Sequence, residues 1–589
     1  MLERRRPHFW HYLLLAIILG LLGWFLIVPI LLTVRGGFAA DPATGTGFTL
    51  DHLLLVFQDP LNRQGLLNSA AIGFFTTLLC MVIGLPLAML NAGYSYPCKK
   101  MLNAVALVPL ILPPFVGAIG LRAILGRQGT LNTLLGTDFD ILGEGRFWGV
   151  VITQALHLYP IIYLNATAAL ANLDPALKEC AENLGAGPFR RFFRITMPLI
   201  RPGLFAGGTI VFIWSFTELG TPLMFDYYTV TPVQIFFGLK EVENSAEPYA
   251  LTVVLLGCSI LLYAVGKTLF GGRAHAMYAK ASRASAEKPL VGLPGFLATA
   301  AFFAVGLLAI VPHLGVIFTS LSAPGAWYHS ILPESFTLEH FGYALSDPAA
   351  TTSIRNSLLL SLAAMSLDIV VGLVIAYLLV RTTIRGRSLL DALCMLPLAV
   401  PGLVMAFGYV AMTLAWPFGR PLVIGSAEDP LLTIPVLFPG VLEVFGANPN
   451  PFPLLVIAYA VRRLPYIVRS TVAGLEQTSG ELEEAAVNLG ASRPVAVVKI
   501  IVPLIMANII AGGLLVFSFS MLEVSDSLIL AQKSMHYPIT KQIFAFSEML
   551  GVGQHVASAM GVWGMALLTV TLVGASLLLG KKLGSIFRV

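Results

Sequence analysis

Several carboxylates lie within apolar segments of this 589-residue chain, where a charged group is costly, and three of them share a spacing pattern. Glu218 and Glu523 each follow a serine by three residues, and Asp526 follows Glu523 by another three. We expect all three to face the interior of a helical bundle, because lipid cannot solvate a carboxylate. Oxygen ligands suit hard cations, so Glu218, Glu523 and Asp526 are candidates for lining a cation translocation pathway.

Glu218 and Glu523 support a more specific hypothesis, a transient metal site. If they lie opposite each other, a passing cation relieves the repulsion between their charges, and the site stays weak enough to release it. The alternative is that each acid bonds to neighbouring helices and only stabilises the bundle. The five cysteines are scattered without metal-site or redox spacing, so we expect no stable metal site, no disulfide and no cofactor.

A second pair of matching stretches lies in polar islands between long apolar segments. Glu179–Ala186 reads Glu-Cys-Ala-Glu-Asn-Leu-Gly-Ala, and Glu484–Ala491 reads Glu-Ala-Ala-Val-Asn-Leu-Gly-Ala. Gly185 and Gly490 suit the left-handed residue that ends a helix. Each island is therefore predicted to form a short helix, a sharp stop and a second short helix. One copy would fit an ordinary loop, whereas two copies in register favour a shared function.

The two islands have recognisable borders. Asp174-Pro175 can cap and open the first helix, and Thr478-x-x-Glu481 is a capping-box pattern that can open the second. Pro198 and Pro503, at the same spacing from the preceding glycines, mark where the next apolar segment starts.

The composition is that of a polytopic membrane protein. Hydrophobic residues make up 57% of the chain and charged residues only 11%, against roughly 25% charged in soluble domains. Apolar runs of about 20 residues, each long enough to cross a bilayer, recur about twelve times. The fold class is therefore predicted to be all-α. The expected spans are 12–34, 67–93, 101–126, 147–171, 199–223, 248–271, 295–321, 355–380, 390–416, 452–475, 503–530 and 556–580.

Basic residues predict the orientation. With the N-terminus in the cytoplasm, roughly 26 of the 36 Lys and Arg fall inside, as the positive-inside rule requires. Both termini and both polar islands are then cytoplasmic. The net charge of +5 follows from this topology and does not indicate nucleic-acid binding.

The chain repeats itself. Asn68-Ser69 matches Asn356-Ser357, and Gly84 matches Gly372 at the same offset; a larger offset then relates Pro160 to Pro465 and Glu218 to Glu523. The extra residues lie around 417–451. We therefore predict two homologous six-helix halves in the same orientation, 1–272 and 295–589, joined by a cytoplasmic linker at 273–294. Same-orientation repeats imply a pathway between the halves.

Several other residues in the apolar segments have more than one interpretation. Prolines in both third spans, at 109, 113, 114, 397 and 401, are interpreted as kinks near an outer gate or as packing kinks. Asp368 has no acidic match in the first half and is interpreted as a packing residue. Arg462, Arg463 and Arg469 lie near the inner end of a span, where they can extend to lipid headgroups.

The islands resemble the Glu-Ala-Ala loop of the membrane subunits of binding-protein-dependent ABC importers. The second copy matches fully, and the first has Cys180 in place of alanine. The resemblance implies a type I ABC importer permease fold with coupling loops at 174–198 and 478–503, which dock on the ATPase. The implied coupling residues are Glu179, Ala181, Gly185, Pro198, Glu484, Ala486, Gly490 and Pro503.

The same resemblance implies the partners and the location. The partners are a homodimer of ABC ATPase subunits and a periplasmic or lipid-anchored substrate-binding protein, and the location is the bacterial inner membrane. The chain has no Walker A sequence, so a separate subunit is expected to hydrolyse ATP.

The substrate is suggested by a closer resemblance. Leu396–Gly402 and Met521–Ala531 look like the ferric-iron permease subgroup, with thiamine, phosphonate and polyamine permeases as alternatives. An ion-coupled secondary transporter also fits parallel repeats and intramembrane acids, but it gives no reason for two matched cytoplasmic helices. A membrane enzyme would need a nucleophile or an acid–base cluster that the sequence does not offer.

Overall fold

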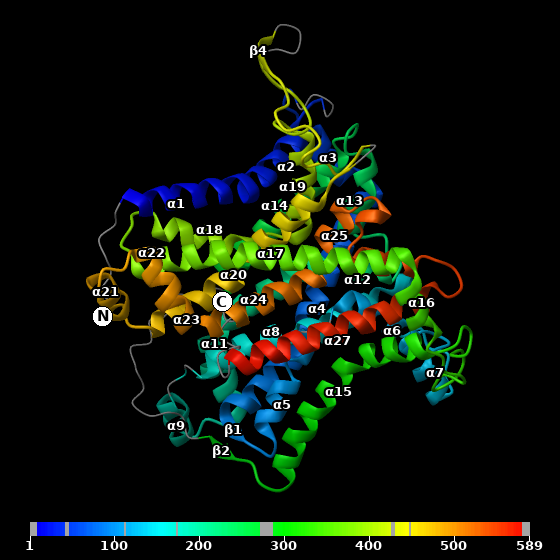
Figure 1. Ribbon diagram of the computed structural model, residues 1–589. Helices are drawn as coiled ribbons and strands as arrows, with labels where there is room; N and C mark the ends of the chain where they lie inside the picture. The colour runs from blue at the N-terminus through cyan, green and yellow to red at the C-terminus, as the bar shows by residue number, and fades with distance from the viewer. Residues whose placement is uncertain are drawn as a thin grey trace. The chain divides into compact units, whose positions relative to one another are not determined.

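The computed structural model describes residues 9–41, 46–110, 113–171, 173, 175–270, 287–425, 430–446 and 449–579, and nearly all regular structure there is helical (Figure 1). The chain divides into two compact units. Unit 1 holds the described residues of Met1–Asp59, Gln234–Val254 and Glu339–Ile586, and unit 2 those of Pro60–Val233 and Leu255–Leu338.

The elements of unit 1 are α1 Phe9–Leu22, α2 Val28–Phe38, α3 Asp51–Gln58, α16 Glu339–Ser346, α17 Pro348–Arg381, α18 Arg387–Ala399, α19 Gly402–Leu414, β3 Leu422–Gly425, β4 Pro430–Ile434, α20 Phe452–Gln477, α21 Glu481–Asn488, α22 Arg493–Ala496, α23 Val502–Leu504, α24 Met506–Met521, α25 Ser525–Leu530, α26 Ile539–Ser547 and α27 Gly553–Leu579. The strands β3 and β4 form an antiparallel hairpin in the loop that lengthens the second repeat.

The elements of unit 2 are α4 Pro60–Gly93, β1 Tyr94–Ser95, α5 Lys99–Val105, α6 Pro114–Leu125, α7 Thr130–Leu135, α8 Phe147–Ala171, α9 Pro175–Asn183, α10 Pro188–Arg191, α11 Met197–Phe216, α12 Gly220–Met224, β2 Lys288–Pro289 and α15 Leu293–Leu321. Two further helices, α13 Thr231–Gly238 and α14 Glu247–Phe270, are divided between the units.

The helices have the length and apolar character of membrane spans. Seven described helices qualify alone, and three bent pairs bring the number to ten. The two remaining predicted spans also form long helices, α20 and α27. The second bent pair, α18 and α19, turns by 105° between Ala399 and Gly402, so the predicted break at Pro401 is confirmed. The all-α polytopic fold expected from the sequence is therefore confirmed.

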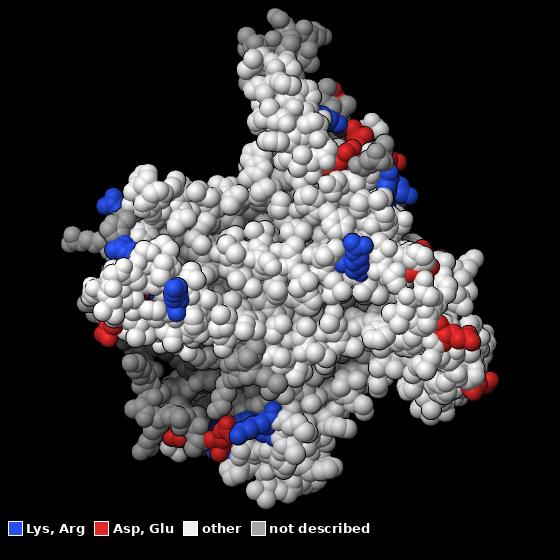
Figure 2. Space-filling view, viewed as in Figure 1, with Lys and Arg blue, Asp and Glu red and all other residues white. Residues whose placement is uncertain are grey.

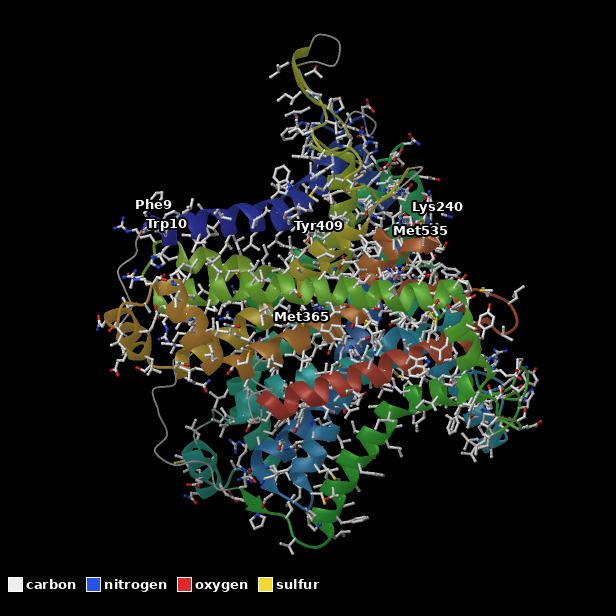
Figure 3. The ribbon with its side chains drawn as sticks, viewed as in Figure 1. Phe9, Trp10, Lys240, Met365, Tyr409 and Met535 are labelled. Carbon is white, nitrogen blue, oxygen red and sulfur yellow. The ribbon has the colours of Figure 1, made fainter. Side chains whose placement is uncertain are left out.

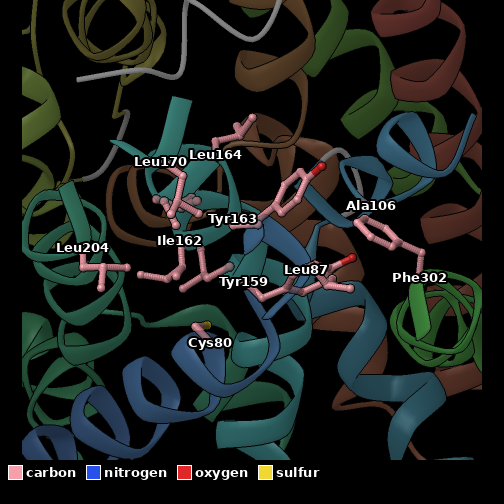
Figure 4. Close-up of a cluster of buried hydrophobic side chains, with 14 of the residues drawn as sticks. Cys80, Leu87, Ala106, Tyr159, Ile162, Tyr163, Leu164, Leu170, Leu204 and Phe302 are labelled. Atoms are coloured by element: carbon pink, nitrogen blue, oxygen red, sulfur yellow. The ribbon is translucent and has the colours of Figure 1, made fainter. Parts of the chain in front are cut away.

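Unit 2 is built around α8, which packs against α4 and α11. Buried side chains of these helices form one apolar cluster that includes Cys80, Tyr159, Ile162 and Leu204 (Figure 4). Gly84 makes the α4–α8 crossing close, since a Cβ there would lie 3.0 Å from the Tyr159 carbonyl oxygen.

Unit 1 repeats this arrangement with α17, α20 and α24, and α27 packs against α24. Gly372, the repeat match of Gly84, allows α17 to approach α20, because a Cβ there would lie 2.7 Å from Cγ2 of Ile467. A smaller apolar cluster that includes Leu475, Ile501 and Ile505 joins these helices.

The first spans make their most extensive described contacts with helices of the other repeat. Helix α2 packs on α19, whereas α15 packs along α6. Each crossing depends on a repeat-matched glycine: a Cβ on Gly120 would lie 1.9 Å from the Pro312 carbonyl oxygen, and one on Gly408 would lie 2.8 Å from the Pro29 backbone. Contacts this short exclude any side chain. The units therefore differ from the sequence halves by an exchange of first spans and by Gln234–Val254, a first-half segment that belongs to unit 1.

Two equivalent sets of hydrogen bonds account for the repeated Asn-Ser pair. Asn68 donates from Nδ2 to the Thr229 carbonyl oxygen at 2.8 Å, and Ser69 Oγ accepts from the Thr231 amide at 3.0 Å. In unit 1, Asn356 donates to the carbonyl oxygens of Met535 and Tyr537, and Ser357 Oγ accepts from the Ile539 amide at 2.8 Å. Each repeat thus ties its second span to the segment before α13 or α26.

Candidate functional site

The first island has the predicted helix, stop and helix. Helix α9 begins at Pro175 and α10 begins at Pro188, while Asp174 of the predicted cap lies outside the described residues. Gly185 is left-handed, with φ +75°. The Ala186 amide donates to the Ala181 carbonyl oxygen and the Gly185 amide donates to that of Glu182, both at 2.9 Å. These two bonds form a Schellman motif, which satisfies the last carbonyls of α9.

The second island has the same stop. Gly490 has φ +92°, and the Ala491 amide donates to the Ala486 carbonyl oxygen at 3.0 Å. The predicted capping box is wrong: α21 begins at Glu481 after Gly480, with no side-chain cap. Thr478 instead ends α20, and its hydroxyl donates to the Gly474 carbonyl oxygen at 3.0 Å. Because α20 runs on to Gln477, this threonine lies too early to cap α21.

The predicted coupling residues occupy equivalent places in both islands. Glu179 and Glu484 are exposed, whereas Ala181 and Ala486 are buried. The prolines are exposed in the first turn of a helix, Pro198 in α11 and Pro503 in α23. A π-helical turn precedes each proline, at Phe192–Thr196 and Val497–Ile501.

Leu184 and Leu489 are the feature of the islands that sequence reasoning missed. They are 87% and 89% exposed, just before the left-handed glycines. The repeated Asn-Leu-Gly-Ala was the available signal, since an exposed leucine at one place in two copies is a candidate contact. The left-handed glycine and its bonds hold each leucine at the tip of the island.

The islands differ in their attachment. In unit 1, Glu483 is fully buried and accepts a bond from the Tyr377 hydroxyl at 2.8 Å, while Arg381 Nη2 donates to the Thr478 carbonyl oxygen at 2.7 Å. In unit 2, Arg191 of α10 pairs with Glu182 of α9 at 2.6 Å. Helix α21 is thus tied to the end of span α17, whereas α9 is tied to its own partner helix.

The acids of the second repeat form a buried charge cluster. Glu523 is paired with two arginines, since Arg462 Nη1 lies 2.5 Å from Oε1 and Arg463 contacts Oε2. Arg462 Nη2 also lies 3.2 Å from Asp526 Oδ1 and donates to the Gly402 carbonyl oxygen at 2.6 Å. The interpretation of Arg462 and Arg463 as headgroup-directed is therefore wrong, because both guanidinium groups point at acids inside the bundle.

The cluster balances its own charge. Two arginines face Glu523 and Asp526, which are only 4% and 1% exposed. Gly402 provides room for Arg462, since a Cβ there would lie 2.4 Å from Nη1. A paired arrangement of this kind joins α20 to the segment that follows α24, which is the bonding that the structural alternative predicts.

Glu218 has different surroundings. Its Oε1 accepts from the Thr221 amide at 3.3 Å, and its side chain is half-buried. The offset from Glu218 to Glu523 places His157 and Leu158 at the positions of Arg462 and Arg463, and Thr221 at that of Asp526. The first repeat therefore keeps the acid without the two arginines.

Figure 2 shows few charged side chains over the helices of the face it presents. Such a surface suits lipid. Within unit 1, Phe9 and Trp10 lie at one end and Lys240 and Met535 at the other, with Tyr409 between them (Figure 3). The exposed aromatic residues at the start of α1 are typical of the membrane interface.

Two segments, residues 81–275 and 368–584, match the family described as "Binding-protein-dependent transport system inner membrane component". Together they cover more than half of the chain, and each contains one island. The chain belongs to this family. It is a fused permease with two copies of the family domain, and it is a transport component of a binding-protein-dependent ABC importer.

Relatives in this permease family differ in substrate. The ferric transport system permease protein FbpB of Actinobacillus pleuropneumoniae is 26% identical over 533 residues, covering 87% of this chain and 70% of its own length. The molybdenum transport system permease protein ModB of Escherichia coli K12 is 32% identical over 171 residues, covering 29% and 74%. The spermidine/putrescine transport system permease protein PotB of Haemophilus influenzae is 31% identical over 206 residues, covering 34% and 71%.

Proposed function

We propose that this permease imports ferric iron across a bacterial inner membrane, powered by a separate homodimer of ATPase subunits. The single observation that carries the substrate is the ferric relative, whose match extends over both repeats of one fused chain. The molybdenum and spermidine matches each cover less than half of the chain.

In this proposal the islands are the ATPase contacts. Exposed Leu184 and Leu489 enter apolar hollows on the two ATPase subunits, and Glu179 and Glu484 lie on the exposed face beside them. Both islands and both termini are cytoplasmic. Helix α21 is bonded to the end of span α17, whereas α9 is paired with α10. This difference supports unequal roles for the two islands in transmitting movement from the ATPase.

The pathway role falls mainly on Glu218. Glu218 is half-buried and can meet a passing cation at lower cost than the more deeply buried Glu523, whose two oxygens are occupied by Arg462 and Arg463. Glu523 and Asp526 then have a structural role, because their charges are balanced by Arg462 and Arg463.

The proposal is tested by uptake into proteoliposomes that contain this chain and its ATPase, with the companion binding protein outside. Labelled ferric iron should accumulate only with ATP inside, and an excess of molybdate, thiamine, phosphonate or spermidine should not compete. Uptake driven by an ion gradient without ATP would contradict the importer, and competition by one of these compounds would reassign the substrate.

Polyamine import is the second candidate. It is favoured by the spermidine relative and by the same acid, because Glu218 suits any cation. Labelled spermidine in the same vesicles separates the two candidates directly.

A further inference from the structure

Unit 2 contains a polar pocket that has no role in the proposed function. It has a volume of about 680 Å³ and lies where α6, α8 and α12 end or begin. Three arginines line it, Arg122, Arg127 and Arg146, with only Asp140 and Asp226 as acids. A volume of several hundred Å³ is typical of ligand sites.

Guanidinium groups outnumber carboxylates in this pocket, and two of them also donate to backbone carbonyl oxygens, Arg122 to Met224 and Arg146 to Phe225. Asp226 is shared by two guanidinium groups: Arg122 Nη2 lies 3.1 Å from Oδ2, and Arg146 contacts the same oxygen. Arg127 has a looser pair, 3.6 Å from Asp140 Oδ2, and is 68% exposed. The three arginines and two acids leave a net positive charge, and each guanidinium carries five donors in a planar fork that matches an oxyanion.

Trp327 is an independent sign of a missing acceptor. Its ring lines the pocket, and its indole Nε1 is a buried donor for which the described residues provide no hydrogen-bond partner. A buried donor without an acceptor is unfavourable, and such groups are rare in folded proteins. An oxyanion in the pocket would supply that acceptor.

The repeat shows that this charged set is not needed for the six-helix fold. The matching positions in the second half carry Val410 for Arg122, Pro451 for Arg146 and Ala531 for Asp226. Two of the pocket residues also have left-handed backbones, Arg146 at φ +67° and Asp226 at φ +55°. Such conformations are costly for these residues.

The pocket lies far from the first island. Phe147, at the start of α8, follows the pocket residue Arg146, and the other end of α8 leads to α9. A helix of 25 residues is roughly 37 Å long, which is enough to cross the hydrocarbon core of a bilayer, about 30 Å thick. If the island is cytoplasmic, the pocket opens on the side from which substrate arrives.

We propose that this pocket is an oxyanion site that takes a carboxylate group on the outer side of the membrane. The carboxylate comes either from an acidic side chain of the binding protein or from a free polycarboxylate. Both sources present the same chemistry to the three arginines and to Trp327. The site does not depend on which substrate is transported.

The test is isothermal titration calorimetry of the full chain in lipid nanodiscs, with citrate as the probe and spermidine as the cationic control. Citrate should bind saturably and spermidine should not. Arg127→Gln should weaken citrate binding about five-fold through the loss of one charge-assisted hydrogen bond, and Trp327→Phe should weaken it less.

Asp140→Asn should change the affinity for citrate in the opposite direction to Arg127→Gln. It removes the acid that competes for Arg127, while its amide oxygen can still accept from the Gly143 amide, which now lies 3.1 Å from Asp140 Oδ1. Citrate should bind about three-fold tighter. Lys533→Gln removes one positive charge, as Arg127→Gln does, but in unit 1, and it should leave citrate binding unchanged.

A purely structural salt-bridge network predicts no saturable citrate binding, or identical binding in all these variants, and either result would overturn the proposal. Adding the binding protein to the citrate-loaded chain distinguishes the two sources. Displacement of citrate identifies an acidic side chain of that protein, and undisturbed binding identifies a free polycarboxylate.

Discussion

Arg462 and Arg463 decide what the acids of the second repeat can do. Each oxygen of Glu523 contacts one of these guanidinium groups, so its charge is already compensated within the bundle. Hydropathy and spacing placed Glu523 and Asp526 in a span and facing inward, but they could not choose the partners. Pairing depends on which helix packs beside α24 and α25, and that is a property of tertiary packing.

Glu523→Gln should therefore destabilise the protein, because it leaves two buried guanidinium groups facing a single remaining acid. We expect a loss of about 3 kcal/mol, seen as a lower midpoint of thermal unfolding in detergent. Glu218→Gln is the matched control from the first repeat: it should unfold like wild type and show reduced cation uptake. Equal stability of the two variants would show that the buried pairs contribute nothing.

Lys541, which lies outside the predicted spans, should make the free energy of unfolding depend on pH. Burial lowers its pKa to about 8 from 10.5, and repulsion from Lys240 adds to the effect. The folded protein thus favours the neutral amine, so stability is lowest below pH 8 and rises as the pH approaches 10.5. The gain should reach about 1.4 kcal/mol per pH unit and should be missing in Lys541→Met. Parallel unfolding curves of both proteins across this range would contradict it.

At the scale of elements, the islands were the best predicted part of the chain. Each island forms a helix, a left-handed stop and a second helix because of local backbone preferences. The positions of glycine and proline in the sequence indicate these preferences directly. The buried attachment of α21 was not predictable. Tyr377 and Glu483 are 106 residues apart, and nothing local shows that the end of α17 meets the island.

The left-handed glycines lead to a sharp substitution test. A Cβ on Gly185 or Gly490 would find no atom within 4 Å, so only the backbone conformation opposes a side chain there. The double change to Asn should retain transport, because Asn tolerates this conformation, whereas the double change to Val should abolish it while leaving the protein in the membrane.

The measurements are uptake and co-purification with the ATPase. If the Val variant still binds and stimulates the ATPase, the islands are not the coupling contacts. If Asn and Val behave alike, the left-handed backbone conformation of the two glycines is not what transport requires.

At the scale of the whole molecule, the repeat and the all-helical polytopic fold were predictable, whereas the grouping of helices was not. Apolar runs show which segments enter the membrane but not which of them pack together. The crossings at Gly120 and Gly408 bring α15 to α6 and α2 to α19, so each unit contains a first span from the other sequence half. Neither half can bury these surfaces alone.

This exchange leads to a prediction about the linker. Either half expressed alone should give no uptake, whereas co-expressed fragments 1–280 and 281–589 should restore part of it. The end of the linker is held in unit 2, since Glu287 lies 2.8 Å from Lys99 Nζ, β2 pairs with β1, and the Leu290 amide donates to the Ser95 carbonyl oxygen at 2.9 Å. Deleting 287–290 from the second fragment should therefore lower recovery well below that of a fragment lacking only 281–284. Uptake by a single half, or equal recovery with both deletions, would show that the exchanged spans and the strand do not hold the halves together.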